Sequence, residues 1–107
     1  MNIQDLQKEA IRIREKYAEF ERNRNGKEWT RAEIMEGFVD DVGDLMKLVM
    51  AKEGVRHIDN VDEKLKHELA DCLWSILVLA SKYEIDLEES FLKTMKELEN
   101  RLANNRE

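Results

Sequence analysis

The sequence predicts an all-α protein, and three observations support this fold class. The chain has 107 residues with no proline and four glycines, so little interrupts a helix. Glu, Lys, Leu, Ala, Met and Arg, which favour helix, are abundant. Apolar residues recur every three or four positions. At this length one domain is expected. We therefore predict a single domain over residues 1–107, folded as an antiparallel bundle of four to five helices.

The first two helices are bounded by recognisable signals. Apolar residues from 3 to 20 form one narrow stripe, and the pattern stops at Asn-Arg-Asn-Gly (23–26), which suits a helix C-terminus. Thr30 and Glu33 form a capping-box pattern that begins a second helix. This helix is expected to run to residue 52 or 53, with Gly54 as its cap.

Two more helices are expected in the second half of the chain. The segment 55–61 is predicted as a loop, and a third helix begins near residue 60 or 62 and ends at about residue 83. Asp86 and Glu89 form another capping-box pattern. The fourth helix that they begin is expected to fade near residue 103, leaving 104–107 as a frayed tail.

The third predicted helix is unusually apolar. Residues 69–80 read LADCLWSILVLA, apolar on nearly every side. A helix that is hydrophobic all round needs cover all round, and three other short helices supply only part of it. We expect a second subunit to cover the remainder, so that oligomerisation completes the bundle. The alternative is a buried central helix in a monomer.

Composition excludes several function classes. No stretch approaches 18 consecutive apolar residues, and residues 1–10 lack the apolar core of a signal peptide; neither a membrane span nor membrane association is expected. A net charge of −6 argues against a nucleic-acid partner. No glycine-rich phosphate-binding pattern occurs. A single cysteine fits a reducing compartment, which indicates a cytoplasmic protein.

Acidic residues interrupt the apolar faces of two consecutive helices. At about 100° per residue, Asp41 projects inside the apolar arc of the second helix, Asp44 lies one turn on at its edge, and Asp40 lies nearer the polar side. On the third helix, Glu68 and Asp71 lie within or beside the apolar run. The arc of the second helix is formed by Ile34, Phe38, Val42, Leu45, Met46, Leu48 and Val49.

Two acidic pairs at i and i+3 therefore face each other from neighbouring helices. Buried ionised carboxylates without a partner are costly, and four close together repel one another and raise each other's pKa. A bound cation is the obvious compensation, and all-oxygen ligands favour Mg²⁺ or Mn²⁺ over zinc. The alternative is a solvated surface on which the acids pair with Lys47, Lys64 or Lys82.

Other candidate residues carry weaker signals. His57 and His67 lack the Glu-x-x-His spacing of a di-iron bundle. Cys72 lies in the apolar run and is expected to be a small core residue. Trp29 is expected to pack against other residues, or to form a wall on which a base stacks, together with Tyr17 and Phe20.

Two segments resemble a known family. VDDVGDLMKLV (39–49) and HELADCLWSILVLASKYEIDLEESFLKTMKELENR (67–101) are similar to the MazG-type nucleotide pyrophosphohydrolases, all-α enzymes related to dimeric dUTPases. The family pattern is EExxE on one helix and ExxD on the next. Here ExxD is intact at residues 68–71, whereas the first motif reads Asp-Asp-Val-Gly-Asp (40–44). The resemblance covers about residues 29–101.

The resemblance implies an activity and a set of roles. Members hydrolyse nucleoside triphosphates to monophosphate and pyrophosphate with Mg²⁺ or Mn²⁺, and serve to remove non-standard nucleotides. It implies Asp41, Asp44, Glu68 and Asp71 as metal ligands, with Asp40 as an extra ligand or a base that orients water. Members assemble as dimers or tetramers, so the basic residues that face a metal site can come from a neighbouring chain. The residues expected to contact substrate are Lys93, Lys96, Asn100, Arg101 and Trp29; for the first four, the alternative is a solvated helix face.

The first motif also leaves an alternative open. All three acids of residues 40–44 are Asp where the family has Glu, and each is shorter by one methylene, a little over 1 Å. A site built for Glu closes on Asp only if the helices approach or water fills in. The alternative function is a catalytically degenerate helical dimer that binds nucleotide or metal, or acts as an interaction module. A third reading is a structural bundle whose acids pair with lysines.

Overall fold

The computed structural model describes residues 1–105 and confirms the all-α fold class. Its helices are α1 (Ile3–Asn25), α2 (Arg31–Lys52), α3 (Val61–Lys82) and α4 (Leu87–Asn104). These bounds lie close to the predicted ones. The predicted frayed tail begins one residue too early, since Asn104 is still helical, and its last two residues, 106–107, lie outside the described part of the chain. Over the described residues, no helix combines the length and apolarity that a membrane span requires.

The helix ends follow from local side-chain chemistry. Thr30 and Glu33 form the predicted capping box of α2, and Asp86 accepts the backbone N–H of Glu89 at the start of α4. Gly26 follows α1 with φ of 83°, a left-handed conformation that costs glycine little. At the end of α2 the cap is Glu53 rather than the predicted Gly54, because Gly54 takes the following left-handed position with φ of 81°.

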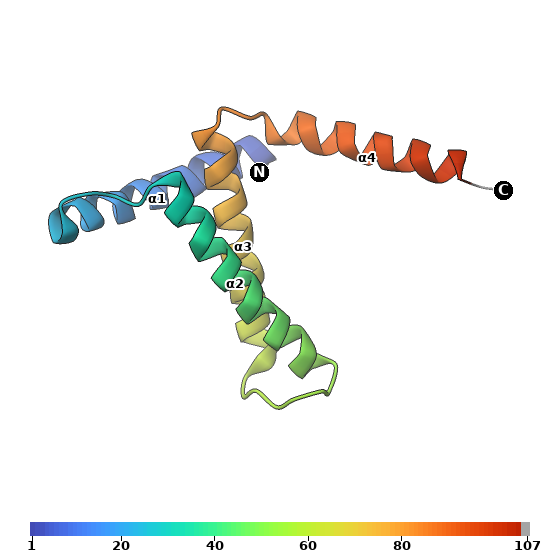
Figure 1. Cartoon of the computed structure of the whole chain (residues 1–107), viewed down its shortest axis with the longest axis horizontal. Coiled ribbons are helices and arrows are strands. Elements are labelled where there is room, and N and C mark those ends of the chain that lie inside the picture. Colours follow the sequence, from blue (N-terminus) through green and yellow to red (C-terminus); the bar gives the residue numbers. More distant parts are fainter. Residues whose placement is uncertain (106–107) are drawn as a thin grey trace.

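The helices form an open arrangement rather than a closed bundle within one chain (Figure 1). α2 and α3 make an antiparallel hairpin, α1 crosses near the C-terminal end of α3, and α4 extends away from both. The radius of gyration is 17.2 Å, against about 13 Å for a compact domain of this length. No residue of α4 is buried. Within residues 1–105, α4 therefore lacks the antiparallel neighbour predicted from the short turn before it.

The core is small and lies where α1, α2 and α3 meet. Ala10, Ile34, Leu77 and Val78 form its buried cluster, with Trp74 packed against it. The Trp74 indole N–H donates to the backbone carbonyl of Ala10 at 2.9 Å, which fixes α1 on α3. This junction holds the end of the hairpin at which α2 begins and α3 ends, and the acidic residues lie further along the hairpin toward its loop.

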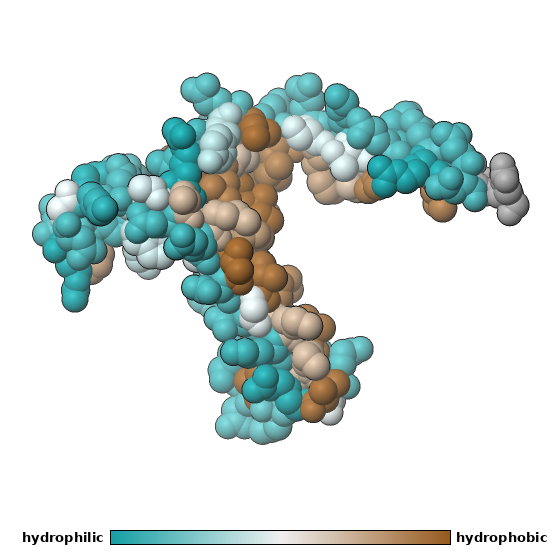
Figure 2. Space-filling model, in the orientation of Figure 1, coloured by the Kyte–Doolittle hydropathy of each residue, from teal (hydrophilic) through white to brown (hydrophobic). Residues whose placement is uncertain are grey.

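Apolar residues that this core does not use form exposed stripes on three helices. Figure 2 shows apolar surface along the α2–α3 hairpin and on one edge of α4. The predicted arc of α2 divides in two, because Ile34 and Leu48 turn toward α3 whereas Val42, Met46 and Val49 remain exposed. The other exposed residues at helical spacing are Met35 and Val39 on α2, Leu69, Leu73 and Ile76 on α3, and Phe91, Met95, Leu98 and Leu102 on α4.

Candidate metal centre

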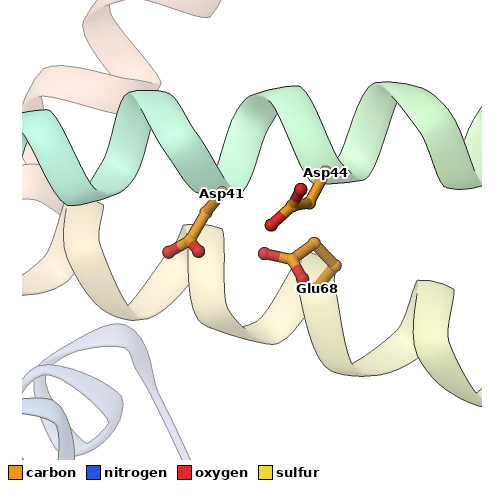
Figure 3. Close-up of side chains that lie close together, drawn as sticks. All are labelled: Asp41, Asp44 and Glu68. Carbon is orange, nitrogen blue, oxygen red and sulfur yellow. The ribbon is translucent and has the colours of Figure 1, made fainter.

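Three of the predicted metal ligands converge between α2 and α3. Asp41 and Asp44 project from successive turns of α2 toward Glu68 of α3 (Figure 3). Each side chain offers one oxygen, and the three oxygens lie within 4.8 Å of one another. The antiparallel pairing of α2 and α3 therefore brings together the two motifs that the sequence separates by more than twenty residues.

The chemistry of this cluster fits a divalent cation. Ligand oxygens about 2.1 Å from an octahedral Mg²⁺ lie about 3.0 Å apart when adjacent and about 4.2 Å apart when opposite. The three oxygens, all within 4.8 Å of one another, would therefore draw together by up to about 1.8 Å to close on one ion. Glu68 Oε1 is buried and has no hydrogen-bond partner. Within residues 1–105, neither Asp41 nor Glu68 forms an ion pair with a lysine or arginine. The shorter Asp side chains thus still bring their oxygens near Glu68.

The electrostatics of the cluster are those of uncompensated negative charge. Burial raises the pKa of Asp41; the adjoining Glu68 carboxyl opposes this shift, and the charges of Asp71, Asp44 and Asp40 reinforce it. Burial also raises the pKa of Glu68, and the charges of Asp41, Asp71 and Asp44 raise it further. A cation placed among these oxygens would favour both ionised forms and reverse the shifts.

The other two predicted acids lie beside this cluster rather than in it. Asp71 is half-buried, and its Oδ2 lies 3.2 Å from Nε2 of His67. Asp40 is exposed. Both line a cleft together with Asp41, so all five predicted acids occupy one region of the hairpin. Of the three lysines considered as neutralising partners, Lys47 approaches a predicted ligand, at 4.0 Å from Asp44.

The cleft beside the cluster has a volume of about 370 Å³ and mixed walls. Asp40, Asp41 and Asp71 form its acidic side, while Trp29 and Trp74 are among its aromatic and apolar residues. The predicted substrate residue Trp29 is thus placed beside the carboxylates. Tyr17, considered as a second stacking wall, instead packs on Trp74 with ring centroids 5.7 Å apart.

The structure also places cations and a histidine near the cluster that the sequence did not connect with substrate. A second hollow of about 410 Å³ lies toward the loop of the hairpin and is lined by Asp44 and Glu68 with Lys47, Lys64 and His67. From the sequence, these lysines are expected only as salt-bridge partners of the acids, and His67 lacks the spacing of a di-iron ligand. Their spacing of three or four residues from the acids on the same helix was the sequence signal that could have placed them beside the cluster.

The four substrate residues predicted on α4 lie away from the cluster. All four are exposed, and α4 extends from the hairpin. At 100° per residue, Lys93, Lys96 and Asn100 share the face opposite the apolar stripe. Arg101 lies on its flank. Their contact with phosphates stays a prediction, and it requires a partner chain.

Fold and site together define a class: an all-α protein whose central helix hairpin carries a carboxylate cluster suited to a divalent cation. The family model of the MazG nucleotide pyrophosphohydrolase domain matches residues 38–105. The match covers more than half of the chain and contains both acidic motifs, so the chain belongs to this family and the predicted resemblance is confirmed. Comparisons of this chain with the curated proteins and with the solved structures gave no match.

Proposed function

We propose that the protein is a Mg²⁺-dependent nucleoside triphosphate pyrophosphohydrolase that converts (d)NTP to (d)NMP and pyrophosphate. Family membership supports nucleotide pyrophosphohydrolase chemistry in general. The observation that carries the metal dependence is the group of three carboxylate oxygens within 4.8 Å, with one buried Glu68 oxygen lacking a partner. Removal of non-standard nucleotides in the cytoplasm is the role we propose for this activity.

Asp41, Asp44 and Glu68 would hold the ion, and Asp71 would complete the ligand set from the next turn of α3. When bound, Mg²⁺ or Mn²⁺ supplies neutralisation of the triphosphate and a lowered pKa of water. The acidic chain itself would otherwise repel an anionic nucleotide. Neutralisation of these negative carboxylates by the cation therefore decides whether the substrate binds.

Asp40 is the residue we propose to orient the attacking water. It is exposed on the cleft wall beside Asp41, where its carboxylate can accept a proton from water. The water oxygen bonds to one of the two phosphorus atoms of the α–β linkage, and the bond from that phosphorus to the bridging oxygen breaks. The bridging oxygen keeps the electron pair, and the products are the nucleoside monophosphate and pyrophosphate.

A panel of nucleotides tests the proposal. The purified protein is incubated with canonical and modified NTPs and dNTPs plus Mg²⁺ or Mn²⁺, and both pyrophosphate and monophosphate are measured. We expect equal amounts of the two products from at least one nucleotide, and none when the metal is chelated. Folded protein that releases no pyrophosphate across the panel would instead favour the degenerate binding module.

We propose that the protein works as a homodimer or homotetramer, because the apolar stripes on α2, α3 and α4 remain exposed in the described part of the chain, residues 1–105. We expect a solution mass two or four times the chain mass of 12.7 kDa. Leu98→Glu should shift the mass toward the monomer, whereas Asn100→Glu, on the opposite face of α4, should not. Light scattering after size exclusion measures this, and a monomeric wild-type protein would contradict it.

Lys93, Lys96, Asn100 and Arg101 are proposed to contact phosphates bound at a partner's carboxylate cluster. Subunit mixing tests this. Glu68→Gln and the double variant Lys93→Gln/Lys96→Gln are each expected to have low activity as homo-oligomers. Their mixture should regain activity, since a mixed pair contains one site with intact carboxylates and intact lysines. Activity in the mixture that equals the average of the two separate variants would show that the lysines do not act across subunits.

A further inference from the structure

A buried ion pair in α1 has no role in the chemistry described so far. Arg14 and Glu21 lie two turns apart and form a salt bridge, and each residue is 7% exposed. The Glu9–Arg12 pair of the same helix is more than half exposed. Desolvation offsets most of the attraction in a buried ion pair. A gain in the stability of the fold therefore does not explain by itself why these two charges are buried.

The contacts of this pair lead to Trp29. Glu21 Oε1 accepts both from Arg14 and from the backbone N–H of Trp29, the latter at 2.9 Å. The Arg14 guanidinium lies over the Trp29 ring, 5.7 Å from its centroid, a distance typical of a cation–π contact. Two residues of α1 therefore fix both the backbone and the indole of a residue beyond the turn at Gly26.

The Trp29 indole also meets α2, at Gly37. A Cβ atom added at Gly37 would lie 3.1 Å from the indole Cζ3, so this position is open only because it is glycine. Gly37 precedes Asp41 by about one turn. Arg14, Trp29, Gly37 and Asp41 all line the 370 Å³ cleft. The indole thus contacts both a buried cation and the helix that carries the carboxylates.

We propose that the Arg14–Glu21 ion pair is a positioning device that holds the Trp29 indole as the aromatic wall of the carboxylate-lined cleft. Arg14 and Glu21 do not touch the reacting groups. They act through Trp29 on a flat aromatic group of the ligand, such as a nucleobase. This inference rests on the proposed function for the identity of the ligand. The segment matched by the family model begins at residue 38, so none of these three residues belongs to it.

A spectroscopic experiment tests the positioning without any turnover. The protein contains two tryptophans, so labelling with 5-fluorotryptophan gives two ¹⁹F resonances, which Trp29→Phe assigns. Glu21→Gln and the double variant Arg14→Met/Glu21→Met, which leaves no unpaired buried charge, should shift or broaden the Trp29 resonance more than that of Trp74. Glu9→Gln is the matched control and should change neither. A Trp29 resonance unchanged in both test variants would overturn the proposal.

Kinetics then test whether the positioned indole serves the ligand. Glu21→Gln should raise KM for the best nucleotide about three- to tenfold with kcat little changed. In a Trp29→Phe background the same substitution should add no further increase, because its effect passes through Trp29. Equal increases in both backgrounds would overturn the route through Trp29. If no nucleotide is turned over, the ¹⁹F result still decides the positioning, so the two failures are distinguishable.

Discussion

Glu68→Gln is expected to lower kcat about 1,000-fold or more while the protein stays folded. The substitution keeps size and shape but removes the charge of the ligand whose Oε1 is buried without a partner. Metal-assisted stabilisation of a transition state contributes several kcal/mol, and about 4 kcal/mol corresponds to a thousandfold change in rate. Steady-state assays with saturating Mg²⁺ measure the loss, and circular dichroism checks that the helices remain.

The control for this variant is Glu36→Gln. Glu36 is an exposed residue of α2, so the same chemical change there should leave kcat within about twofold of the wild type. Asp41→Asn should resemble Glu68→Gln, since both side chains belong to the same cluster. Wild-type kcat in Glu68→Gln would remove this residue from the metal site and with it the proposed mechanism.

Divalent cations are expected to stabilise the fold strongly. An ion that binds only the folded state at 100 times its Kd stabilises by about 2.7 kcal/mol. For a chain of about 100 residues this corresponds to a rise in Tm of roughly 10–20 °C. Thermal unfolding at fixed protein concentration, with EDTA or with Mg²⁺ or Mn²⁺, measures the shift. A wild-type Tm that does not change with divalent ions would favour the purely structural bundle. A rise in Tm of the same size in Glu68→Gln would do so as well.

The pH dependence of the chelated protein has a definite sign. Folding raises the pKa values of Asp41 and Glu68 above their ordinary values of 3.8 and 4.5. Their contribution to stability is therefore fully present below those values and is lost as pH rises through the raised values. With EDTA, the Tm of the wild type should fall relative to that of Glu68→Gln over this range. A difference in Tm between the two proteins that stays constant with pH would contradict the raised pKa of Glu68.

Much of the fold was predictable because its signals are local. The Thr30–Glu33 box and the Asn-Gly stop at 25–26 act within one turn, and the structure has them where expected. The placement of α4 was not predictable in this way. Its apolar stripe indicates only that something must cover it. The stripe does not specify which surface would cover it.

The candidate site was predictable in part for a related reason. Helical spacing places Asp41 with Asp44, and Glu68 with Asp71, on shared faces. Spacing does not fix the register between two helices, and in the structure it is Glu68, not Asp71, that joins the α2 pair within 4.8 Å. The Arg14–Glu21 pair gave no usable signal, because a charged pair seven residues apart reads as a solvated face unless its burial is known.

The most direct test of the central claim, that the α2–α3 carboxylates bind a divalent cation, is titration of Mn²⁺ into chelator-free protein while the EPR signal of free Mn²⁺ is recorded. We predict saturable binding of at least one ion per chain. Binding should be lost in the double variant Asp41→Asn/Glu68→Gln and kept in Glu36→Gln. Free Mn²⁺ that rises in wild-type protein as it does in buffer would contradict the claim.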